Sequence, residues 1–353
     1  MLGRSIASRT IIRQATIIIP CPTFRALPTL LQLRPRPSRS LQRQPPAQRS
    51  IMTARLDNDK EYLAISKDET IYQPFLLSPI PGAEKTPDGE LAVDKDDWVQ
   101  GLELDHVKEM VKSVPEGRRV KILIMYGSLR ERSFSRLMAY EAARILHTIG
   151  CHVRTYDPLG LPVKDDTQHD HPKVQELRQL SEWSDGQFWC SPEQHGNVTA
   201  VFKNQIDWIP LSVGSVRPTQ GRTVGLCQIN GGSQSFNTLS FLRNLGRWMR
   251  MFVIPNQSSL PLAWKCFTPA GRLLPSSNRD RLVDVCEELV KFTVLLLPHF
   301  QVLGDRYSER EEKRVKGRLL TQAEKEKEKD ASLAASKDKE RLKDLHKAHD
   351  GSK

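Results

Sequence analysis

The chain has 353 residues and a formal net charge of +11, from 53 Lys and Arg against 42 Asp and Glu. Residues 1–56 alone hold ten Arg and no acidic residue, so the remaining 297 residues carry a net charge of only +1. This distribution argues against a basic nucleic-acid-binding surface on the body of the protein. The six Cys show neither a C-x-x-C pair nor zinc-ligand spacing, which argues against a disulfide scaffold and a metal site.

The two ends of the chain differ in composition from its middle. Residues 1–56 are rich in Arg, Ser, Gln and Pro, which is typical of mitochondrial presequences, whereas translation from Met52 would leave a cytoplasmic protein. No apolar run approaches the roughly 20 residues that cross a bilayer, so we expect no membrane-spanning segment. Residues 57–118 are expected to form an N-terminal arm laid over another surface, and residues 301–353 a charged, solvated C-terminal tail.

Residues 119–300 alternate between short apolar runs and helix-like stretches. The apolar runs predict five strands, at residues 120–126, 151–156, 185–190, 223–229 and 251–254. The other stretches predict five helices, at residues 134–148, 171–183, 198–209, 236–249 and 279–297. Strands that alternate with helices favour a parallel sheet covered on both faces. The expected fold is therefore α/β, a flavodoxin-like, doubly wound five-stranded parallel sheet.

In such a sheet, ligands bind outside the carboxyl ends of the strands, where the strand order reverses. The loop after the first strand carries hydroxyl and guanidinium groups at the start of a helix, on Ser128, Ser133, Ser135, Arg130, Arg132 and Arg136. Backbone N–H groups, hydroxyls and forked cations together favour a dianionic phosphate, and a single phosphate site indicates a mononucleotide. A capped helix with surface arginines is the alternative interpretation, for which Ser133 followed by Arg136 is sufficient.

The loop after the third strand reads Ser-Pro-Glu-Gln-His-Gly at residues 191–196. Pro192 and Gly196 are expected to bracket a turn whose backbone groups face outward, suited to the edge of a flat heterocycle. His195 is either part of this site or an ordinary loop histidine. Cys190, directly before the loop, is the one thiol close enough to take part in the chemistry of the site, although a strand cysteine is more often part of the core.

The loop after the fourth strand contains Gly231 and Gly232, which permit close backbone approach. Ser235 or Asn237 is expected to cap the next helix. The loop is either a second cradle for a ring edge or only a strand-to-helix turn. The helix that follows carries more apolar side chain than one sheet face needs, which fits a subunit contact or a plain core helix equally well.

Five segments together resemble the ArsH group of arsenical-resistance flavoproteins, within the NADPH-dependent FMN reductase family. They lie at residues 127–130, 191–196, 204–210, 231–236 and 245–259. The resemblance runs from about residue 120 to residue 300 and leaves both ends outside. It implies a flavodoxin-like fold, bound FMN, NADPH as the electron donor and a homotetramer.

The resemblance also implies roles for individual residues. Those expected to bind the FMN phosphate are Ser128, Arg130, Ser133, Ser135 and Arg136. Those expected to contact the isoalloxazine ring are Pro192, Glu193, Gln194 and His195 on one side and Gly231, Gly232 and Ser233 on another. Gln194 stands where many members have Arg. No side chain is expected to act as a nucleophile, because the flavin carries the redox chemistry.

The expected function is an NADPH-dependent, FMN-containing oxidoreductase. Its acceptor would be a quinone, an azo compound, dioxygen, a metal ion or an organoarsenical. A flavodoxin-like electron carrier is the alternative, but carriers usually present an acidic face and this body is near neutral. A noncatalytic adaptor that binds nucleic acid through residues 1–56 is the third hypothesis.

Overall fold

The computed structural model describes residues 62–115, 118–210 and 218–350. The expected leader, residues 1–56, lies outside the described residues, as does the start of the expected arm. None of the described helices is both long and apolar enough to cross a membrane.

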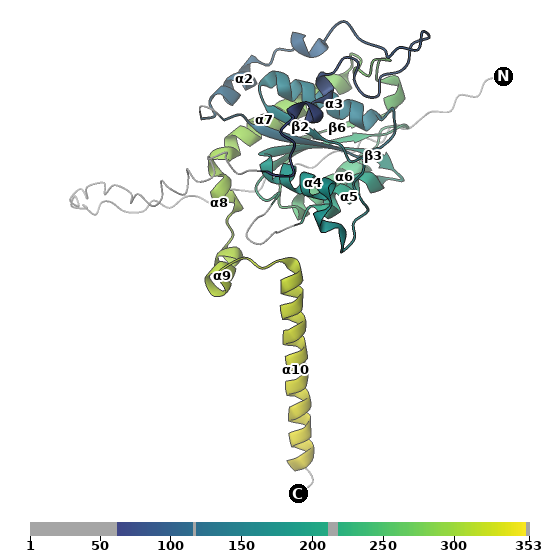
Figure 1. Cartoon of the computed structure of the whole chain (residues 1–353). Helices are drawn as coiled ribbons and strands as arrows, with labels where there is room; N and C mark the ends of the chain where they lie inside the picture. The colour runs from purple at the N-terminus through teal and green to yellow at the C-terminus, as the bar shows by residue number, and fades with distance from the viewer. Residues whose placement is uncertain (1–61, 116–117, 211–217, 351–353) are drawn as a thin grey trace, which may run out of the picture. The chain divides into compact units, whose positions relative to one another are not determined.

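All five expected strands are present, and they form a parallel sheet in the order β2-β1-β3-β5-β6. Their bounds are Lys121–Tyr126 for β1, His152–Tyr156 for β2, Gly186–Gln194 for β3, Thr223–Ile229 for β5 and Phe252–Leu260 for β6. A two-residue strand that was not expected, β4 (Asn197–Val198), pairs antiparallel with the end of β3. The predicted flavodoxin-like α/β fold is confirmed (Figure 1).

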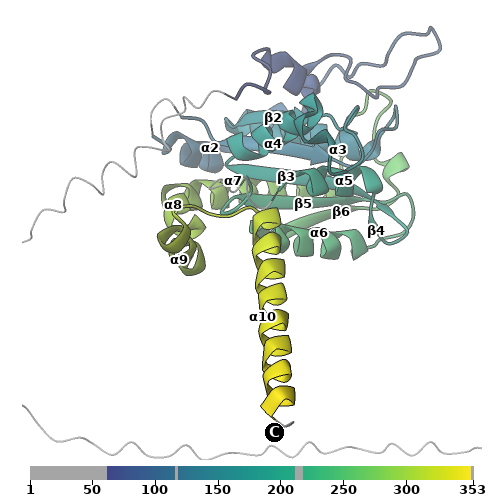
Figure 2. The same ribbon diagram turned by 60° about the horizontal axis from the view of Figure 1, so that its bottom comes forward.

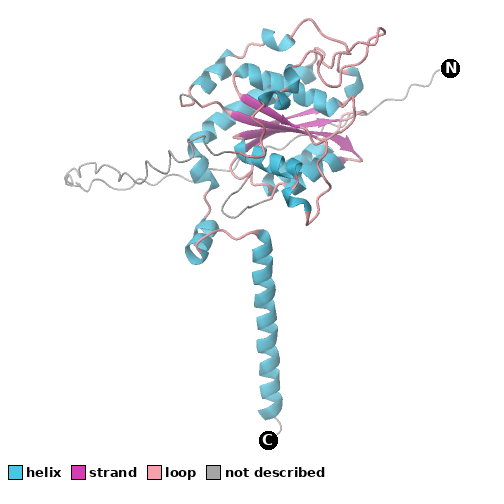
Figure 3. Cartoon of the chain, viewed as in Figure 1, coloured by secondary structure: helices cyan, strands magenta, loops and turns pink. Residues whose placement is uncertain are grey.

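The helices lie in two layers, one on each face of the sheet. Their bounds are Phe134–Ile149 for α3, Pro172–Trp183 for α4, Ala200–Trp208 for α5, Asn237–Trp248 for α6 and Ser277–Leu296 for α7. Helices α3 and α7 cover one face, and α4, α5 and α6 cover the other (Figures 1 and 2). Helix α2 (Asp105–Lys112) packs outside α3 and α7. Figure 3 shows the strands enclosed between these layers, as a doubly wound sheet requires.

Two strands are longer than their apolar runs predict. β3 continues from Cys190 to Gln194, and β6 continues from Ile254 to Leu260. Both extensions are polar or contain proline, so the sequence pattern ends before the strand does. The extended backbone is held by partner strands instead, by β4 and β5 for β3 and by β5 for β6.

The apolar core has two parts because side chains alternate across each strand. On β1, Ile122 and Ile124 join the part under α3 and α7, whereas Leu123 and Met125 join the part under α4, α5 and α6. All four side chains are fully buried. Burial on both faces explains why the strands read as continuous apolar runs.

The arm packs against the body. Its short helices are η1 (Glu69–Tyr72), η2 (Pro74–Leu76) and η3 (Trp98–Gly101). Glu69 forms an ion pair of 2.8 Å with Arg154 of β2, which is an edge strand. Phe75 and Val99 are fully buried in the core part under α3 and α7. The arm therefore shields the edge of the sheet and completes its core.

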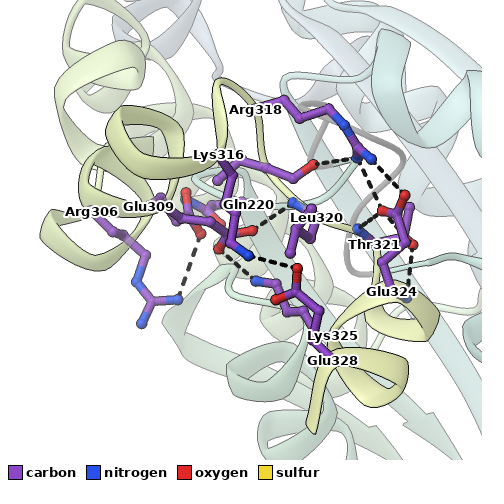
Figure 4. A network of polar contacts seen from close by, with 12 residues as sticks. Gln220, Arg306, Glu309, Lys316, Arg318, Leu320, Thr321, Glu324, Lys325 and Glu328 are labelled. Carbon is purple, nitrogen blue, oxygen red and sulfur yellow. Dashed lines mark hydrogen bonds and ion pairs between the residues drawn. The ribbon is translucent and has the colours of Figure 1, made fainter. Parts of the chain in front are cut away.

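The C-terminal tail contacts the body at residues that precede β5 and β6. Its helices are α8 (Phe300–Gly304), α9 (Tyr307–Lys316) and α10 (Gln322–Asp350). Glu309 of α9 is buried and lies close to Gln220 (Figure 4). It also forms an ion pair of 2.6 Å with Arg250. Leu319 and Leu320 are also buried, so this part of the tail is not solvated. Because Gln220 and Arg250 lie before their strands, the tail contacts the end of the sheet opposite the predicted ligand loops.

Candidate functional site

The loops that follow β1, β3 and β5 lie side by side at the carboxyl edge of the sheet, because these strands are parallel neighbours. The register pairs Tyr126, at the end of β1, with Cys190 of β3, and Cys190 with Cys227 of β5. β2 lies on one side of β1 and β3 on the other, so the strand order reverses between β1 and β3. Doubly wound sheets bind their ligands at this position.

The loop after β1 places its hydroxyls at the start of α3. Ser133 is the N-cap residue; its Oγ accepts a hydrogen bond of 3.2 Å from the Arg136 N–H and lies 3.1 Å from the Ser135 Oγ. Ser128 Oγ accepts a hydrogen bond of 3.3 Å from the Arg130 N–H, which fixes the preceding bend. The helix N-terminus and its dipole favour an anion at this point. An ordinary capped helix would make the same hydrogen bonds. The contacts of the arginine side chains therefore distinguish an anion site from a capped helix.

Arg130 and Arg132 differ in the contacts that their guanidinium groups make. Arg130 is exposed, and its guanidinium has no hydrogen-bond or ion-pair partner in residues 62–115, 118–210 and 218–350. Arg132 instead donates to the carbonyls of Gly82 at 2.7 Å and Thr268 at 2.9 Å. It also lies 2.9 Å from the carboxylate of Glu84. These contacts link the arm to the body and already occupy the Arg132 guanidinium, which agrees with its absence from the expected phosphate ligands.

The third arginine, Arg136, is half-buried beside the loop. Its Nη2 donates to the Glu131 carbonyl, whereas its Nε is buried and has no partner among the residues that the structure describes. A buried N–H without an acceptor costs free energy. An anion at the start of α3 would supply that acceptor.

Gly127 allows the loop after β1 to pack against the start of α5. The Thr199 hydroxyl donates to the Gly127 carbonyl at 2.6 Å. A Cβ on Gly127 would lie 2.8 Å from Thr199 Oγ1 and 2.9 Å from Phe202 Cβ. Since both distances are shorter than ordinary van der Waals contact, only glycine fits here.

The loop after β3 is a β-hairpin. Its two turn residues, His195 and Gly196, both have left-handed backbone conformations, with φ of 51° and 72°. Such a pair is typical of the two-residue turns that match strand twist. The expectation that Pro192 begins the turn is wrong, because Pro192 lies inside β3 and pairs with Ile229. Gln194 and His195 are exposed at the hairpin tip.

The loop after β5 is an open backbone cradle. A Cβ on Gly231 or Gly232 would meet nothing within 4 Å, so internal packing does not require glycine at either position. The Gly232 carbonyl accepts from the Leu262 N–H at 3.0 Å. Within the described chain, the N–H groups of Gly231, Gly232 and Ser233 have no acceptor. Three free donors on an exposed loop suit the carbonyl edge of a heterocycle.

Gln228, which joins the loops after β3 and β5, was not predicted from the sequence. Its Nε2 donates to Glu193 Oε2 of the hairpin at 2.8 Å, and the same oxygen accepts from Ser235 Oγ at 2.7 Å. The signal was present: Gln228 is a lone amide in the otherwise apolar strand β5. Capping of α6 also differs from expectation, because Ser235 Oγ accepts from the Asn237 N–H and Phe236 occupies the N-cap position.

The cysteines near the loops belong to the core. Cys190 and Cys227 are fully buried at paired positions of β3 and β5. Burial raises the pKa of the Cys190 thiol well above its ordinary value. The expectation of a core thiol at Cys190 is confirmed.

The available donors fit FMN. Arg130, Arg136 and the serines at the start of α3 supply cationic and hydroxyl donors for a dianionic phosphate. The free N–H groups of residues 231–233 supply donors for the carbonyl edge of the ring. The phosphate donors and the ring donors follow β1 and β5, with the β3 hairpin between them.

Comparisons with known proteins show the family to which the chain is similar. Residues 120–265 match the family model of NADPH-dependent FMN reductase. The NADPH-dependent FMN reductase ArsH of Shigella flexneri is 58% identical over 197 residues, which cover 56% of this chain and 77% of that protein. The NADPH-dependent FMN reductase ArsH of Rhizobium meliloti is 59% identical over 194 residues, which cover 55% of this chain and 80% of that protein. The solved structure of the NAD(P)H:(acceptor) oxidoreductase FerB from Paracoccus denitrificans aligns with a TM-score of 0.42 at 16% identity, over 52% of this chain and 99% of FerB.

Proposed function

Because this chain belongs to the ArsH group of the NADPH-dependent FMN reductase family, whose members use FMN with NADPH as electron donor, we propose that its three loops bind FMN at the carboxyl edge of the sheet. The observation that carries the proposal is the set of unused donors there. The Arg130 guanidinium and the N–H groups of residues 231–233 have no acceptor in the described chain, although they follow strands separated only by β3.

We assign the phosphate of FMN to the loop after β1. The proposed ligands are Ser128, Arg130, Ser133, Ser135 and the Nε of Arg136. The serine hydroxyls and the first N–H groups of α3 would donate to the phosphate oxygens, and Arg130 would add a charge-assisted contact. The packing of Gly127 against Thr199 holds this loop at the hairpin and α5.

We assign the ring to the space between the hairpin and the cradle. The proposed ring contacts are Pro192, Glu193, Gln194, His195, Gly231, Gly232 and Ser233. When bound, FMN supplies the two-electron chemistry. The backbone N–H groups of residues 231–233 would stabilise negative charge at the carbonyl edge, as donors of an oxyanion hole do. The chain's part is to orient the reactants. NADPH and the acceptor would bind at the same site in turn, so the kinetics would be ping-pong.

The proposed acceptors are quinones, azo compounds, dioxygen, metal ions and organoarsenicals. They share the ability to take electrons from a reduced flavin without needing a protein nucleophile. Steady oxidation of NADPH by the purified protein separates this proposal from a carrier that exchanges single electrons with protein partners.

We further propose that the chain forms a homotetramer. Leu239 and Leu242 of α6 are fully buried, whereas Phe241 and Trp248 on the same helix are 44% and 61% exposed. Phe252, at the start of edge strand β6, is 39% exposed. Exposed aromatic residues on a helix that already fills the core favour a subunit contact. Sedimentation analysis of the purified protein measures the assembly directly.

The experiment that tests the function uses the purified full-length chain. FMN added to the apoprotein should give a bound flavin spectrum, and stopped-flow mixing with NADPH should bleach it faster than mixing with NADH. An acceptor panel added to the reduced protein then ranks the substrates. A chain that retains no FMN, or whose bound FMN is not reduced by NADPH, refutes the proposed function.

A further inference from the structure

Gln228 places an amide group inside the core beneath the proposed flavin site. It is fully buried, and it lies on β5 between the register partners Ser191 of β3 and Ser259 of β6. Transfer of an amide out of water costs free energy unless its hydrogen bonds are replaced. The bonds that Gln228 makes therefore indicate its role.

The Gln228 side chain contacts three separate segments. Its Nε2 donates to Glu193 Oε2 and to the Ser235 carbonyl, both at 2.8 Å. Its Oε1 accepts from the Leu239 N–H at 3.0 Å. Leu239 lies in the first turn of α6, whose N-cap residue makes no side-chain capping bond. One buried amide thus satisfies a helix N–H and bridges the hairpin to the cradle loop.

Two serines complete the same network. Ser235 Oγ donates to Glu193 Oε2 at 2.7 Å, so this carboxylate oxygen receives two hydrogen bonds. Ser259 Oγ donates to the Ser235 carbonyl at 2.6 Å, so this carbonyl also receives two. Removal of the Gln228 amide N–H would leave one donor on each oxygen and would remove the side-chain bond from β5 to Glu193 of the hairpin.

We propose that Gln228 is a positioning residue for FMN: it holds Glu193 and the 231–235 loop at a fixed separation, so that the hairpin and the cradle meet opposite sides of the ring. This inference rests on the proposed function, because it presupposes that both segments contact the flavin. Gln228 does not itself line the surface, so it acts through Glu193 and Ser235.

The decisive variant is Gln228→Glu, which keeps the shape of the side chain and removes its N–H donor. The new carboxyl group would lie against the Glu193 carboxylate, and two such groups do not ionise together easily, so the pair retains a proton to higher pH. With that proton the pair keeps a hydrogen bond; without it the two groups repel. For the variant, the Kd for FMN should be higher at about pH 8 than at about pH 5. The ratio of these two Kd values should exceed the same ratio for the wild-type protein by at least about tenfold.

Dividing the Kd ratio of the variant by that of the wild-type protein removes every pH effect that the two proteins share. His195 lies two residues from Glu193 on the same hairpin and is present in both proteins. The matched control is Gln187→Glu, since Gln187 is also fully buried and lies nearer the opposite end of β3, hydrogen-bonded to Trp189 and Ser184. This control introduces the same charge into the same core without a link to Glu193, so its corrected FMN affinity should not depend on pH.

The measurements are fluorescence titration of apoprotein with FMN across pH and amide hydrogen exchange of residues 193–196 and 231–236 in the apoprotein. The double variant Glu193→Gln/Gln228→Glu restores a donor opposite an acceptor and should recover most of the affinity lost at high pH. If Gln228→Glu does not fold, Ser235→Ala removes one donor to Glu193 and should still weaken FMN binding and speed exchange in both segments.

The outcomes are distinct. Equal pH dependence of FMN affinity in Gln228→Glu and wild type, or the same dependence in Gln187→Glu, overturns the positioning role while leaving the proposed function intact. Unchanged FMN affinity in Ser235→Ala does the same. Failure of the wild-type protein to bind FMN at any pH overturns both the proposed function and this inference.

Discussion

Replacement of Arg130 by Ala tests the phosphate site, because the Arg130 guanidinium has no partner within the described residues. The variant should therefore fold normally, with a change in unfolding free energy of at most about 0.5 kcal/mol, as for surface positions in general. It should lose a charge-assisted contact to the phosphate worth about 1.5–3 kcal/mol. Since about 1.4 kcal/mol is tenfold in affinity, the Kd for FMN should rise by roughly 10- to 150-fold.

Arg132→Ala is the matched control, two residues away in the same loop. Arg132 donates to the carbonyls of Gly82, Pro269 and Thr268 and pairs with Glu84 at 2.9 Å. Its loss should lower the unfolding free energy by about 1–3 kcal/mol and change FMN affinity little.

Urea unfolding and fluorescence titration with FMN, on both apoproteins, measure the two effects separately. Arg130→Lys keeps the charge but loses the forked geometry, so its FMN affinity should be intermediate. The opposite pattern, in which Arg132→Ala weakens FMN binding and Arg130→Ala weakens only the fold, would refute the assignment of the phosphate site.

Three further predictions concern packing, pH and the leader. Gly127→Ala should destabilise the fold by about 1–3 kcal/mol and weaken FMN binding, because its methyl group would lie under 3 Å from two neighbours, whereas Gly101→Ala, with open space, should do neither. Burial lowers the pKa of His152 from 6.5 to about 4, so the folded chain binds fewer protons than the unfolded chain between these values. Stability should rise with pH across this window, and His152→Gln should remove about 1–3 kcal/mol of that rise in thermal melts at pH 4 and 6.5. Deletion of residues 1–51 should leave NADPH turnover intact; a collapse of turnover in an otherwise folded protein would contradict the interpretation of this segment as a leader.

The sequence predicted the sheet well because its strands are buried on both faces. A strand such as β1 that is buried on both faces is apolar along its whole length. It can therefore be recognised from local sequence, without knowledge of the strands with which it pairs. The ends of β3 and β6 escaped the same reasoning, since residues 191–194 and 255–260 are polar or contain proline. Their extended backbone depends on pairing with β4 and β5, and a local pattern carries no information on those partners.

The two halves of the candidate site differ in the same way. The proposed phosphate-binding site lies within residues 128–136, where the helix N-terminus, its N-cap residue and the arginines are close together in the sequence. Local composition alone therefore suggested an anion site. Even there, composition did not separate Arg130 from Arg132, because only the fold brings Gly82 and Thr268 to the second guanidinium. The proposed ring site depends on contacts among the hairpin, β5, the cradle loop, α6 and β6, and these segments meet at Gln228. A buried amide in an apolar strand is the one sign of such a network that a sequence can show, since its polar atoms must be satisfied by segments distant along the chain.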